Sequence, residues 1–269
     1  MSKTAIIIPA RYGSKRLEGK PLLKVCNKPI IQWVWEKAIQ VKSADMVIIA
    51  TDNQQIYDCA KSFGANVEMT SEHHKCGSDR IVEVAQKYPE ISYIINLQGD
   101  EPMISTECVE TVISLLKGDN SVDISTLLSD LDKENVDDPN TVKCVKDKNG
   151  FALYFSRSKI PFERNEGIAK FYKHIGIYGY KREALFEMTK FPQPEIEQAE
   201  SLEQLRALYN GMRIKTAVVK YDSIGIDTIE DYNNFKALIE SKITVWYYIS
   251  VSYGREQHLY LYVGKYKAK

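Results

Sequence analysis

Short apolar runs alternate with segments of helical periodicity through the first 116 residues of the chain. The apolar runs have the length of buried strands and cover Thr4–Ile8, Met46–Ala50, Val67–Met69 and Tyr93–Leu97. The helical segments that follow them cover Ile30–Val41, Gln54–Phe63, Ser78–Tyr88 and Thr106–Leu116. Continuous apolar strands that alternate with helices indicate βαβ units, so the pattern predicts an α/β fold with a mostly parallel sheet and helices on both faces.

The pattern changes between about residues 122 and 180. Shorter strand-like pieces appear there, broken by Asp-Pro-Asn and Lys-Asn-Gly turns: Asp123–Leu127, Val142–Val145, Ala152–Phe155 and Ile175–Tyr180. We interpret them as a smaller β-rich lobe inserted into the sheet. A helix over about Glu195–Tyr209, a strand at Ile214–Val219 and a helix from Thr228 to about Glu240 are expected to complete a single domain over residues 1–243.

Residues 244–269 differ from the rest of the chain. They contain six of the seventeen tyrosines, and Glu256 is their only acidic residue. Apolar positions alternate from Val245 to Tyr253, and Leu259–Val263 could form a second strand, so the pattern favours a β-hairpin. An oligomer contact, an extra edge strand and a segment not native to this fold all remain open for this aromatic, basic tail.

Charge and cysteine usage narrow the class of protein. Lys and Arg number 36, as do Asp and Glu, and this balance argues against a nucleic acid or an acidic membrane as the main partner. No window approaches the ~18 apolar residues of a membrane helix, and the apolar stretch Ala5–Pro9 is shorter than the ~7–15 residues of a signal-peptide core. Five cysteines without a C-x-x-C pair fit a reducing compartment. We therefore expect a cytoplasmic protein with structural thiols.

The loop after the first strand has the composition of a phosphate-binding loop. It places Arg11, Lys15, Arg16 and Lys20 together with two glycines, and cations beside exposed backbone amides suit a triphosphate. The spacing is neither that of a Walker A loop nor that of a Rossmann fingerprint. A solvated basic loop is the alternative reading.

Two aspartates are candidates for a metal site. Asp100 lies three positions after the strand Tyr93–Leu97, at the sheet edge where ligands bind in α/β folds. Mg²⁺ is commonly held by one or two carboxylates together with phosphate oxygens. Asp227 could supply a second carboxylate, but Thr228 and Asp231 resemble a capping box, so Asp227 could equally belong to the start of a helix.

Other polar clusters have weaker signals. After the third strand, Ser78 is expected to cap a helix, and Ser78 and Arg80 offer donors to a nucleobase or a phosphate. The adjacent His73 and His74 are not expected to bind a metal. Arg157, Arg164 and His174 gather in the inserted segment and suit an acidic small molecule. Glutamates 197 and 200 share a helix face with Gln204, which is usually a solvated face.

Several segments together resemble the 3-deoxy-manno-octulosonate cytidylyltransferases, the CMP-Kdo synthetases, over about residues 3 to 240. The segments are Pro-Ala-Arg-Tyr-x-Ser-x-Arg-Leu-x-Gly-Lys-Pro-Leu from Pro9, Gln-Gly-Asp-Glu-Pro from Gln98, Ala-Leu-Tyr-Phe-Ser-Arg from Ala152, His-x-Gly-Ile-Tyr-Gly-Tyr from His174, Leu-Glu-Gln-Leu-Arg from Leu202 and Gly-Ile-Asp-Thr from Gly225. The first loop alone would also fit sugar-nucleotide pyrophosphorylases and CMP-sialate synthetases. The later segments narrow the resemblance to the Kdo branch.

The resemblance implies a Rossmann-like nucleotidyltransferase sheet and transfer of CMP from CTP to the anomeric hydroxyl of Kdo, with pyrophosphate leaving, for lipopolysaccharide synthesis. It implies Mg²⁺ as cofactor and a homodimer, with the short-strand lobe or the aromatic tail as the contact. It also assigns roles to matching positions: Arg11, Arg16 and Lys20 at the triphosphate, Asp100 and Asp227 at the metal, Ser78 and Arg80 near the cytidine, and Gln98, Arg157, Arg164, His174 and Glu200 around the sugar acid. Arg11, Lys20, Asp100 and Asp227 are the expected catalytic residues, with one Mg²⁺ on the pyrophosphate side and a second on the two aspartates.

The chain departs from the family pattern at a few positions. Glu18 replaces a proline common in the first loop and places an anion beside the phosphate-binding segment. Two alternatives to CMP-Kdo synthesis follow from the sequence: the same chemistry on 8-amino-Kdo or a sialic acid, and a protein that binds nucleotide or sugar without turnover.

Overall fold

The computed structural model describes residues 2–13, 17–74, 76–221 and 225–252, with the side chains of the last helix described as far as residue 242. Its strands are β1 (Lys3–Ala10), β2 (Lys24–Val25), β3 (Lys28–Pro29), β4 (Met46–Thr51), β5 (Asn66–Met69), β6 (Ile91–Asn96), β7 (Ile124–Asp130), β8 (Lys143–Lys146), β9 (Ala152–Ser156), β10 (Tyr172–Lys181) and β11 (Ile214–Val218). Its helices are η1 (Lys20–Leu22), α1 (Ile30–Ala38), α2 (Gln54–Ser62), α3 (Gly77–Lys87), α4 (Thr106–Gly118), η2 (Lys133–Asn135), α5 (Arg182–Met188), α6 (Glu195–Glu200), α7 (Gln204–Tyr209) and α8 (Ile229–Ser252).

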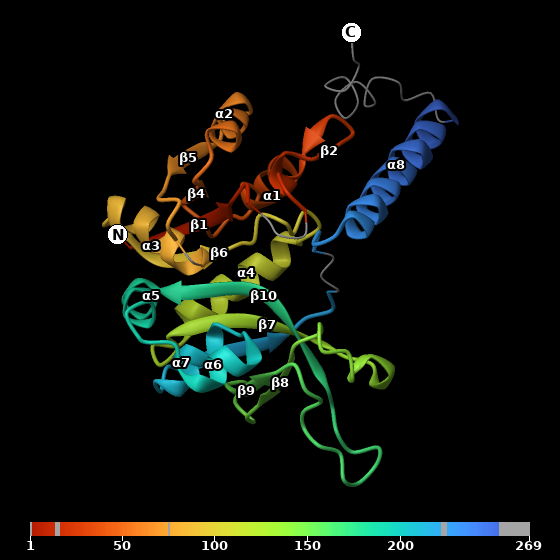
Figure 1. Cartoon of the computed structure of the whole chain (residues 1–269). Helices are drawn as coiled ribbons and strands as arrows, with labels where there is room; N and C mark the ends of the chain where they lie inside the picture. The colour runs from red at the N-terminus through yellow and green to blue at the C-terminus, as the bar shows by residue number, and fades with distance from the viewer. Residues whose placement is uncertain (1, 14–16, 75, 222–224, 253–269) are drawn as a thin grey trace.

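A mostly parallel sheet forms the centre of the molecule (Figure 1). Seven strands follow one another in the order β11-β7-β10-β6-β1-β4-β5. Neighbours pair in parallel except at β10, which is antiparallel to β6 and β7. The predicted α/β class and the strand–helix alternation of the first half are confirmed.

Helices cover both faces of this sheet because the buried strands are apolar on both sides. In β1, Ala5 and Ile7 pack into the core under α3, α5 and α7, whereas Ile6 and Ile8 pack into the core under α1, α2 and α4. All four side chains are fully buried. A strand buried on both faces has a continuous apolar sequence, which is the pattern that predicted it.

The segment from 122 to 180 forms the predicted strands but is not a lobe apart from the sheet. Its strands β7 and β10 are central members of the sheet, and only the β8–β9 pair lies off the main strand order. The connection between β9 and β10 extends away from the sheet (Figure 1). The expectation of an inserted lobe is therefore corrected to two sheet strands with a hairpin and a projecting connection between them.

The predicted helix over Glu195–Tyr209 is in fact two helices. Ser201 adopts a left-handed conformation, with φ of 51°, and separates α6 from α7. This break turns Glu197 and Gln204 inward, where their exposed fractions are 5% and 8%. The expectation of a solvated polar face is wrong for these two residues. The short helix α5, which follows β10 without a turn signal, was not predicted.

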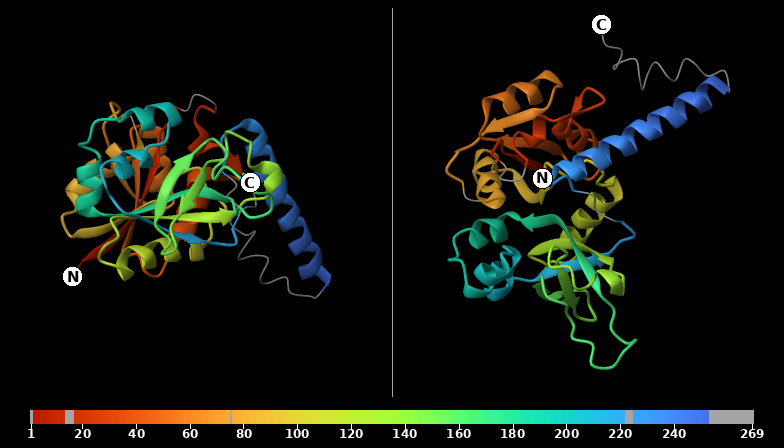
Figure 2. Two further views of the ribbon diagram at one scale, coloured as in Figure 1. Left: turned by 90° about the horizontal axis from the view of Figure 1, so that it is seen from below. Right: turned by 45° about the vertical axis from the view of Figure 1, so that its right-hand side comes forward.

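The last helix is longer than expected. Helix α8 starts with the predicted capping box, in which Asp231 N donates to Thr228 Oγ1 at 3.1 Å and Thr228 N donates to Asp231 Oδ2 at 2.8 Å. It continues to Ser252 and projects from the body (Figure 2), so the expected strand over 245–252 is wrong. No glycine or proline occurs between Gly225 and Gly254, and helix propagation is cooperative once started. The second half of the expected hairpin, Leu259–Val263, lies outside the described residues.

The first half of α8 is anchored to the hairpin β2–β3 and to α1. Phe235 is buried with Val25 and Ile30, and its ring meets Trp33 edge-on with centroids 5.9 Å apart. Tyr232 donates its hydroxyl to Lys24 O at 2.7 Å. None of the described helices is both long and apolar enough to cross a membrane.

Candidate functional site

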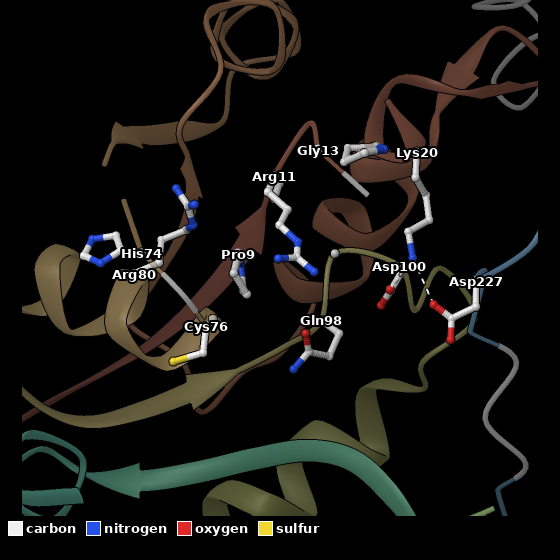
Figure 3. Close-up of a pocket in the computed structure, with 14 residues that line it drawn as sticks. Pro9, Arg11, Gly13, Lys20, His74, Cys76, Arg80, Gln98, Asp100 and Asp227 are labelled. Atoms are coloured by element: carbon white, nitrogen blue, oxygen red, sulfur yellow. Dashed lines mark hydrogen bonds and ion pairs between the residues drawn. The ribbon is translucent and has the colours of Figure 1, made fainter. Parts of the chain in front are cut away.

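A pocket of about 620 Å³ lies at the carboxyl ends of β1 and β6 (Figure 3). Pro9 lies near the end of β1, and Gln98 and Gly99 follow β6. A Cβ on Gly99 would lie 2.8 Å from Pro9 O, so the loop after β6 can approach the end of β1 this closely only because residue 99 has no side chain. The pocket therefore lies at the edge of the sheet where the sequence predicted ligand binding.

Two carboxylates converge on one ammonium group at one end of the pocket. Lys20 Nζ lies 2.6 Å from Asp100 Oδ2 and 3.2 Å from Asp227 Oδ1. Asp100 follows β6, and Asp227 precedes α8, so residues 127 positions apart in the sequence meet here. Lys20 is 9% exposed and is held in η1 by Gly19 in a left-handed conformation, with φ of 63°, and by Pro21. The structure thus brings Lys20, Asp100 and Asp227 together as predicted.

The first loop contributes a second cation to the pocket. Arg11 lines it, and Figure 3 shows its guanidinium between the Lys20 end and the end formed by His74 and Arg80. The other predicted triphosphate residue, Arg16, lies outside the described residues. An arginine beside a lysine in a concave site is suited to bind phosphate oxygens.

Arg80 forms part of the opposite end of the pocket and is fixed in place. It is 3% exposed, its Nη2 lies 2.5 Å from Asp52 Oδ2, and its Nη1 donates to Thr70 Oγ1. Both terminal nitrogens therefore already have partners, in the residues that directly follow β4 and β5. Arg80 acts as a rigid wall of the pocket in this arrangement.

Ser78 has a different role from the one expected. The N-cap of α3 is Cys76 without a side-chain cap, and the Ser78 hydroxyl instead donates to Glu203 Oε2 at 2.9 Å. Ser78 is 1% exposed and does not appear among the described residues that line the pocket. The prediction that Ser78 caps the helix is wrong, and the bond to Glu203 ties the start of α3 to α7.

Cys76 lines the pocket but is not a reactive thiol. Burial, together with the charge of Glu203, raises its pKa to about 12. A thiol with such a pKa stays protonated at neutral pH, and the thiolate is the nucleophilic form. All five cysteines are free, as expected for structural thiols.

Four of the residues expected to surround the sugar acid lie on or next to the sheet: Gln98, Arg157, His174 and Glu200. Gln98 lines the pocket, whereas Arg157 directly follows β9, His174 lies on β10 and Glu200 ends α6. Glu200 joins them: its carboxylate accepts from Ser156 Oγ at 2.6 Å and from Arg157 N at 2.9 Å, while Arg157 Nε donates to Glu200 O at 2.8 Å. The structure therefore brings Arg157 and Glu200 together.

His174 is a neutral, largely enclosed side chain. Its Nε2 lies 3.0 Å from Thr126 Oγ1, and its ring meets Phe155 edge-on with centroids 5.1 Å apart. Burial lowers the pKa of His174 to about 3. Tyr178, whose ring centroid is 5.3 Å from that of His174, pairs in register with Asn96, and Gln98 Nε2 lies 3.5 Å from Asn96 Oδ1. Strand β10, which contains His174, is therefore the direct neighbour of strand β6, which leads to Gln98 at the pocket.

Arg164 is not brought to the pocket. It lies exposed on the β9–β10 connection, which also exposes Phe162 and Ile168 by 84% and 73%. The resemblance placed Arg164 beside the sugar acid, and within this subunit the described residues give it no contact with the other sugar residues. Its role in sugar binding stays a prediction.

Three side chains at or near the site were not predicted from the sequence: Glu203, His74 and Lys143. Glu203 accepts from Ser78, and its Oε1 is buried without a partner among the described residues; only its place in the quoted Leu-Glu-Gln-Leu-Arg segment hinted at a role. His74 lines the pocket and pairs with Glu83. Lys143 is fully buried and donates to Asp138 O, Thr141 O and Arg157 O, which fixes the chain beside Arg157.

The chain matches the family model described as cytidylyltransferase over residues 5–214. It is 49% identical to the 3-deoxy-manno-octulosonate cytidylyltransferase of Thermodesulfovibrio yellowstonii over 242 residues, which cover 85% of this chain and 94% of the relative. It is 43% identical to the enzyme of the same name from Escherichia coli, over 90% of this chain and 98% of the relative.

Solved structures agree with this relationship. CMP:2-keto-3-deoxy-manno-octonic acid synthetase complexed with CTP is 43% identical, with a TM-score of 0.87 over 90% of this chain and 100% of that chain. A 4-diphosphocytidyl-2C-methyl-D-erythritol synthase from Anaerococcus prevotii is 16% identical with a TM-score of 0.60, over 89% of this chain and 96% of that chain, and supports the fold alone.

Proposed function

The chain belongs to the 3-deoxy-manno-octulosonate cytidylyltransferase family, and from that premise we propose that it transfers CMP from CTP to the anomeric hydroxyl of Kdo, releasing pyrophosphate. The observation that carries this proposal is the convergence of Lys20, Asp100 and Asp227 at the ligand edge of the sheet. Transfer at a phosphorus atom depends mainly on positioning and charge neutralisation, which a set of cations and carboxylates can supply.

We assign the triphosphate to the side of the pocket formed by Arg11 and Lys20. Both residues are cationic and line the same cavity, and Arg16 belongs to the same loop. Guanidinium and ammonium groups neutralise the charge that accumulates on the phosphate oxygens during transfer and hold the α-phosphate in line with the attacking hydroxyl. Arg11 and Lys20 are thus the catalytic cations of this proposal.

We further propose that Asp100 and Asp227 hold Mg²⁺. The ammonium group of Lys20 between the two carboxylates supports this assignment, because it shows that both oxygens can face one cation. Two carboxylates fit a Mg²⁺ site completed by phosphate oxygens, and in the described part of the chain no set of three His, Cys, Asp or Glu side chains forms a fuller cage. Bound there, Mg²⁺ supplies charge neutralisation and lowers the pKa of a coordinated hydroxyl.

The sugar acid is assigned to the space between Gln98 and the Ser156–Arg157–Glu200 cluster. Gln98 lines the nucleotide pocket, and Arg157 offers a cation that can pair with a carboxylate. Glu200 orients Arg157 through its own backbone and side chain. His174 stays neutral, so it can hydrogen-bond a hydroxyl without adding charge.

A homodimer is part of the proposal. Phe162 and Ile168 are large apolar side chains exposed on the projecting β9–β10 connection, which supports this segment as the contact with a second copy. Arg164 lies between them in the sequence, so its action in sugar binding depends on that contact. The product CMP-Kdo would serve lipopolysaccharide synthesis, and free thiols are compatible with a reducing cytoplasm.

The test is pyrophosphate release from CTP in the presence of Mg²⁺ with Kdo, 8-amino-Kdo or N-acetylneuraminate. We expect release with Kdo and loss in Asp100→Ala. Asp227→Asn should reduce turnover at least ~100-fold in saturating Mg²⁺, because one ligand of the proposed site is lost. Asp58→Asn, on the exposed side of α2, is the matched control. Release with another sugar acid would correct the substrate, and full activity of Asp227→Asn would remove it from the metal site.

A further inference from the structure

His74 lines the pocket and pairs with a carboxylate, and the proposed chemistry uses neither side chain. His74 lies at the end of the pocket away from Lys20, Asp100 and Asp227, as Figure 3 shows. Its Nε2 lies 2.5 Å from Glu83 Oε2, on α3. The same oxygen accepts from Ser71 N at 2.9 Å. Glu83 therefore holds the loop before α3 at two points, one of which is the imidazole ring.

The carboxylate defines which nitrogen of His74 carries a proton. Partial burial alone would raise the pKa of Glu83, but the hydrogen bonds from Ser71 and His74 lower it, so Glu83 is ionised at neutral pH. An ionised carboxylate only accepts hydrogen bonds, so the facing Nε2 must carry hydrogen. In a neutral imidazole the other nitrogen is then an acceptor. The inference requires this neutral form, in which Nδ1 is the acceptor, and within the described residues the side-chain hydrogen bond of His74 is made by Nε2.

The position of His74 suits contact with the base of the nucleotide. The triphosphate is assigned to the opposite end, near Lys20, and His74 and Arg80 form the remaining end of the same pocket. Both terminal nitrogens of Arg80 are already engaged by Asp52 and Thr70. His74 is therefore the side chain at this end that offers an open acceptor of fixed orientation.

Such an acceptor distinguishes the two pyrimidines. Cytosine carries an amino group, which donates hydrogen bonds, where uracil carries a carbonyl oxygen, which only accepts them. Nδ1 would bind the amino group and repel the carbonyl oxygen. We propose that His74, oriented by Glu83, accepts a hydrogen bond from the amino group of the base and makes the site favour CTP over UTP. This inference rests on the proposed function, since it assigns the base end of the same pocket.

The experiment measures binding directly, as the dissociation constants of CTP and UTP at equilibrium, so it does not depend on turnover. We expect the wild-type protein to bind CTP more tightly and His74→Ala to reduce the ratio of the two constants about tenfold, the value of one lost hydrogen bond with its repulsion. Glu83→Leu, which keeps the imidazole but removes its orientation, should reduce the ratio as well. His73→Ala is the matched control, because this neighbouring histidine is exposed and does not line the pocket.

The outcomes separate this inference from the proposed function. Equal binding of CTP and UTP by the wild type, or an unchanged ratio in His74→Ala, would overturn the role of His74. A reduced ratio in both His74→Ala and Glu83→Leu, with His73→Ala at the wild-type value, supports it. Pyrophosphate release with Kdo is measured separately in the wild type, and its absence despite selective CTP binding would refute the reaction while leaving the assignment of His74 intact.

Discussion

Removing one partner of the buried ion pair between Glu197 and Arg206 should strongly lower the free energy of unfolding. Arg206 Nε lies 2.8 Å from Glu197 Oε2, and Nη2 lies 2.6 Å from Oε1. The two residues are 5% and 6% exposed and join α6 to α7 across the break at Ser201. Arg206→Met keeps an apolar stem of similar length but leaves the Glu197 carboxylate buried with Gln193 Nε2, at 3.2 Å, as its remaining side-chain donor.

The magnitude follows from the burial of the pair. Breaking a buried ion pair by removing one partner typically costs about 3–5 kcal/mol, mostly because a charge stays buried without compensation. At about 2–4 °C per kcal/mol for a chain of this size, the Tm should fall by roughly 6–20 °C. Glu197→Leu combined with Arg206→Met removes both charges, so the double variant should be more stable than Arg206→Met alone.

Thermal and urea unfolding of the wild type, both single variants and the double variant form the assay, and together they give the coupling free energy. A matched control is Lys3→Met, because Lys3 Nζ lies 3.5 Å from Glu90 Oε1 and the two side chains are 45% and 39% exposed. That substitution should change stability by less than ~1 kcal/mol. A loss of less than about 1 kcal/mol in Arg206→Met, or additive losses in the double variant, would refute the reasoning.

Two further predictions concern the site and the sheet. Gly99→Ala should destabilise the fold by about 1–3 kcal/mol and weaken CTP binding, because the new Cβ would lie 2.8 Å from Pro9 O. Gly118→Ala is the control, since a Cβ at residue 118 would have no atom within 4 Å. Equal melting curves for the two variants would contradict the prediction. Stability should be fully present above pH ~6.5 and should fall toward pH 3 by at most ~1.4 kcal/mol per pH unit, because burial lowers the pKa of His174 to about 3 and the unfolded chain binds the proton first. His174→Gln should flatten this part of the urea-unfolding profile, and an unchanged slope would assign it to other groups.

The sequence predicted the first half of the fold well because those strands are buried on both faces. A run such as Thr4–Ile8 is apolar throughout, so its length and its neighbours define it without knowledge of its partners. The helix break at Ser201 was missed for the opposite reason. The left-handed conformation of a non-glycine residue carries no local signal, and only the packing of Leu202 and Leu205 reveals it.

The candidate site was predictable where residues follow a strand or a quoted motif. Lys20, Asp100 and Gln98 line the pocket as expected, since the carboxyl ends of neighbouring parallel strands lie side by side. The role of Ser78 was not predictable, because its partner Glu203 is 125 positions away. The His74–Glu83 pair has no sequence signal, because a carboxylate nine positions after a histidine is an ordinary helix residue.

The ammonium group between Asp100 and Asp227 has a thermodynamic consequence for the binding of the two proposed ligands, a divalent cation and a nucleotide. A divalent cation that takes both carboxylates must first displace Lys20, which then becomes available to the triphosphate. A nucleotide that attracts Lys20 in turn frees the carboxylates for the cation. Each ligand therefore removes part of the cost of binding the other, and by linkage the two affinities rise by the same factor. If Asp100 and Asp227 hold Mg²⁺ as proposed, the lysine would thereby make metal and nucleotide binding positively cooperative, because it exchanges one partner for another.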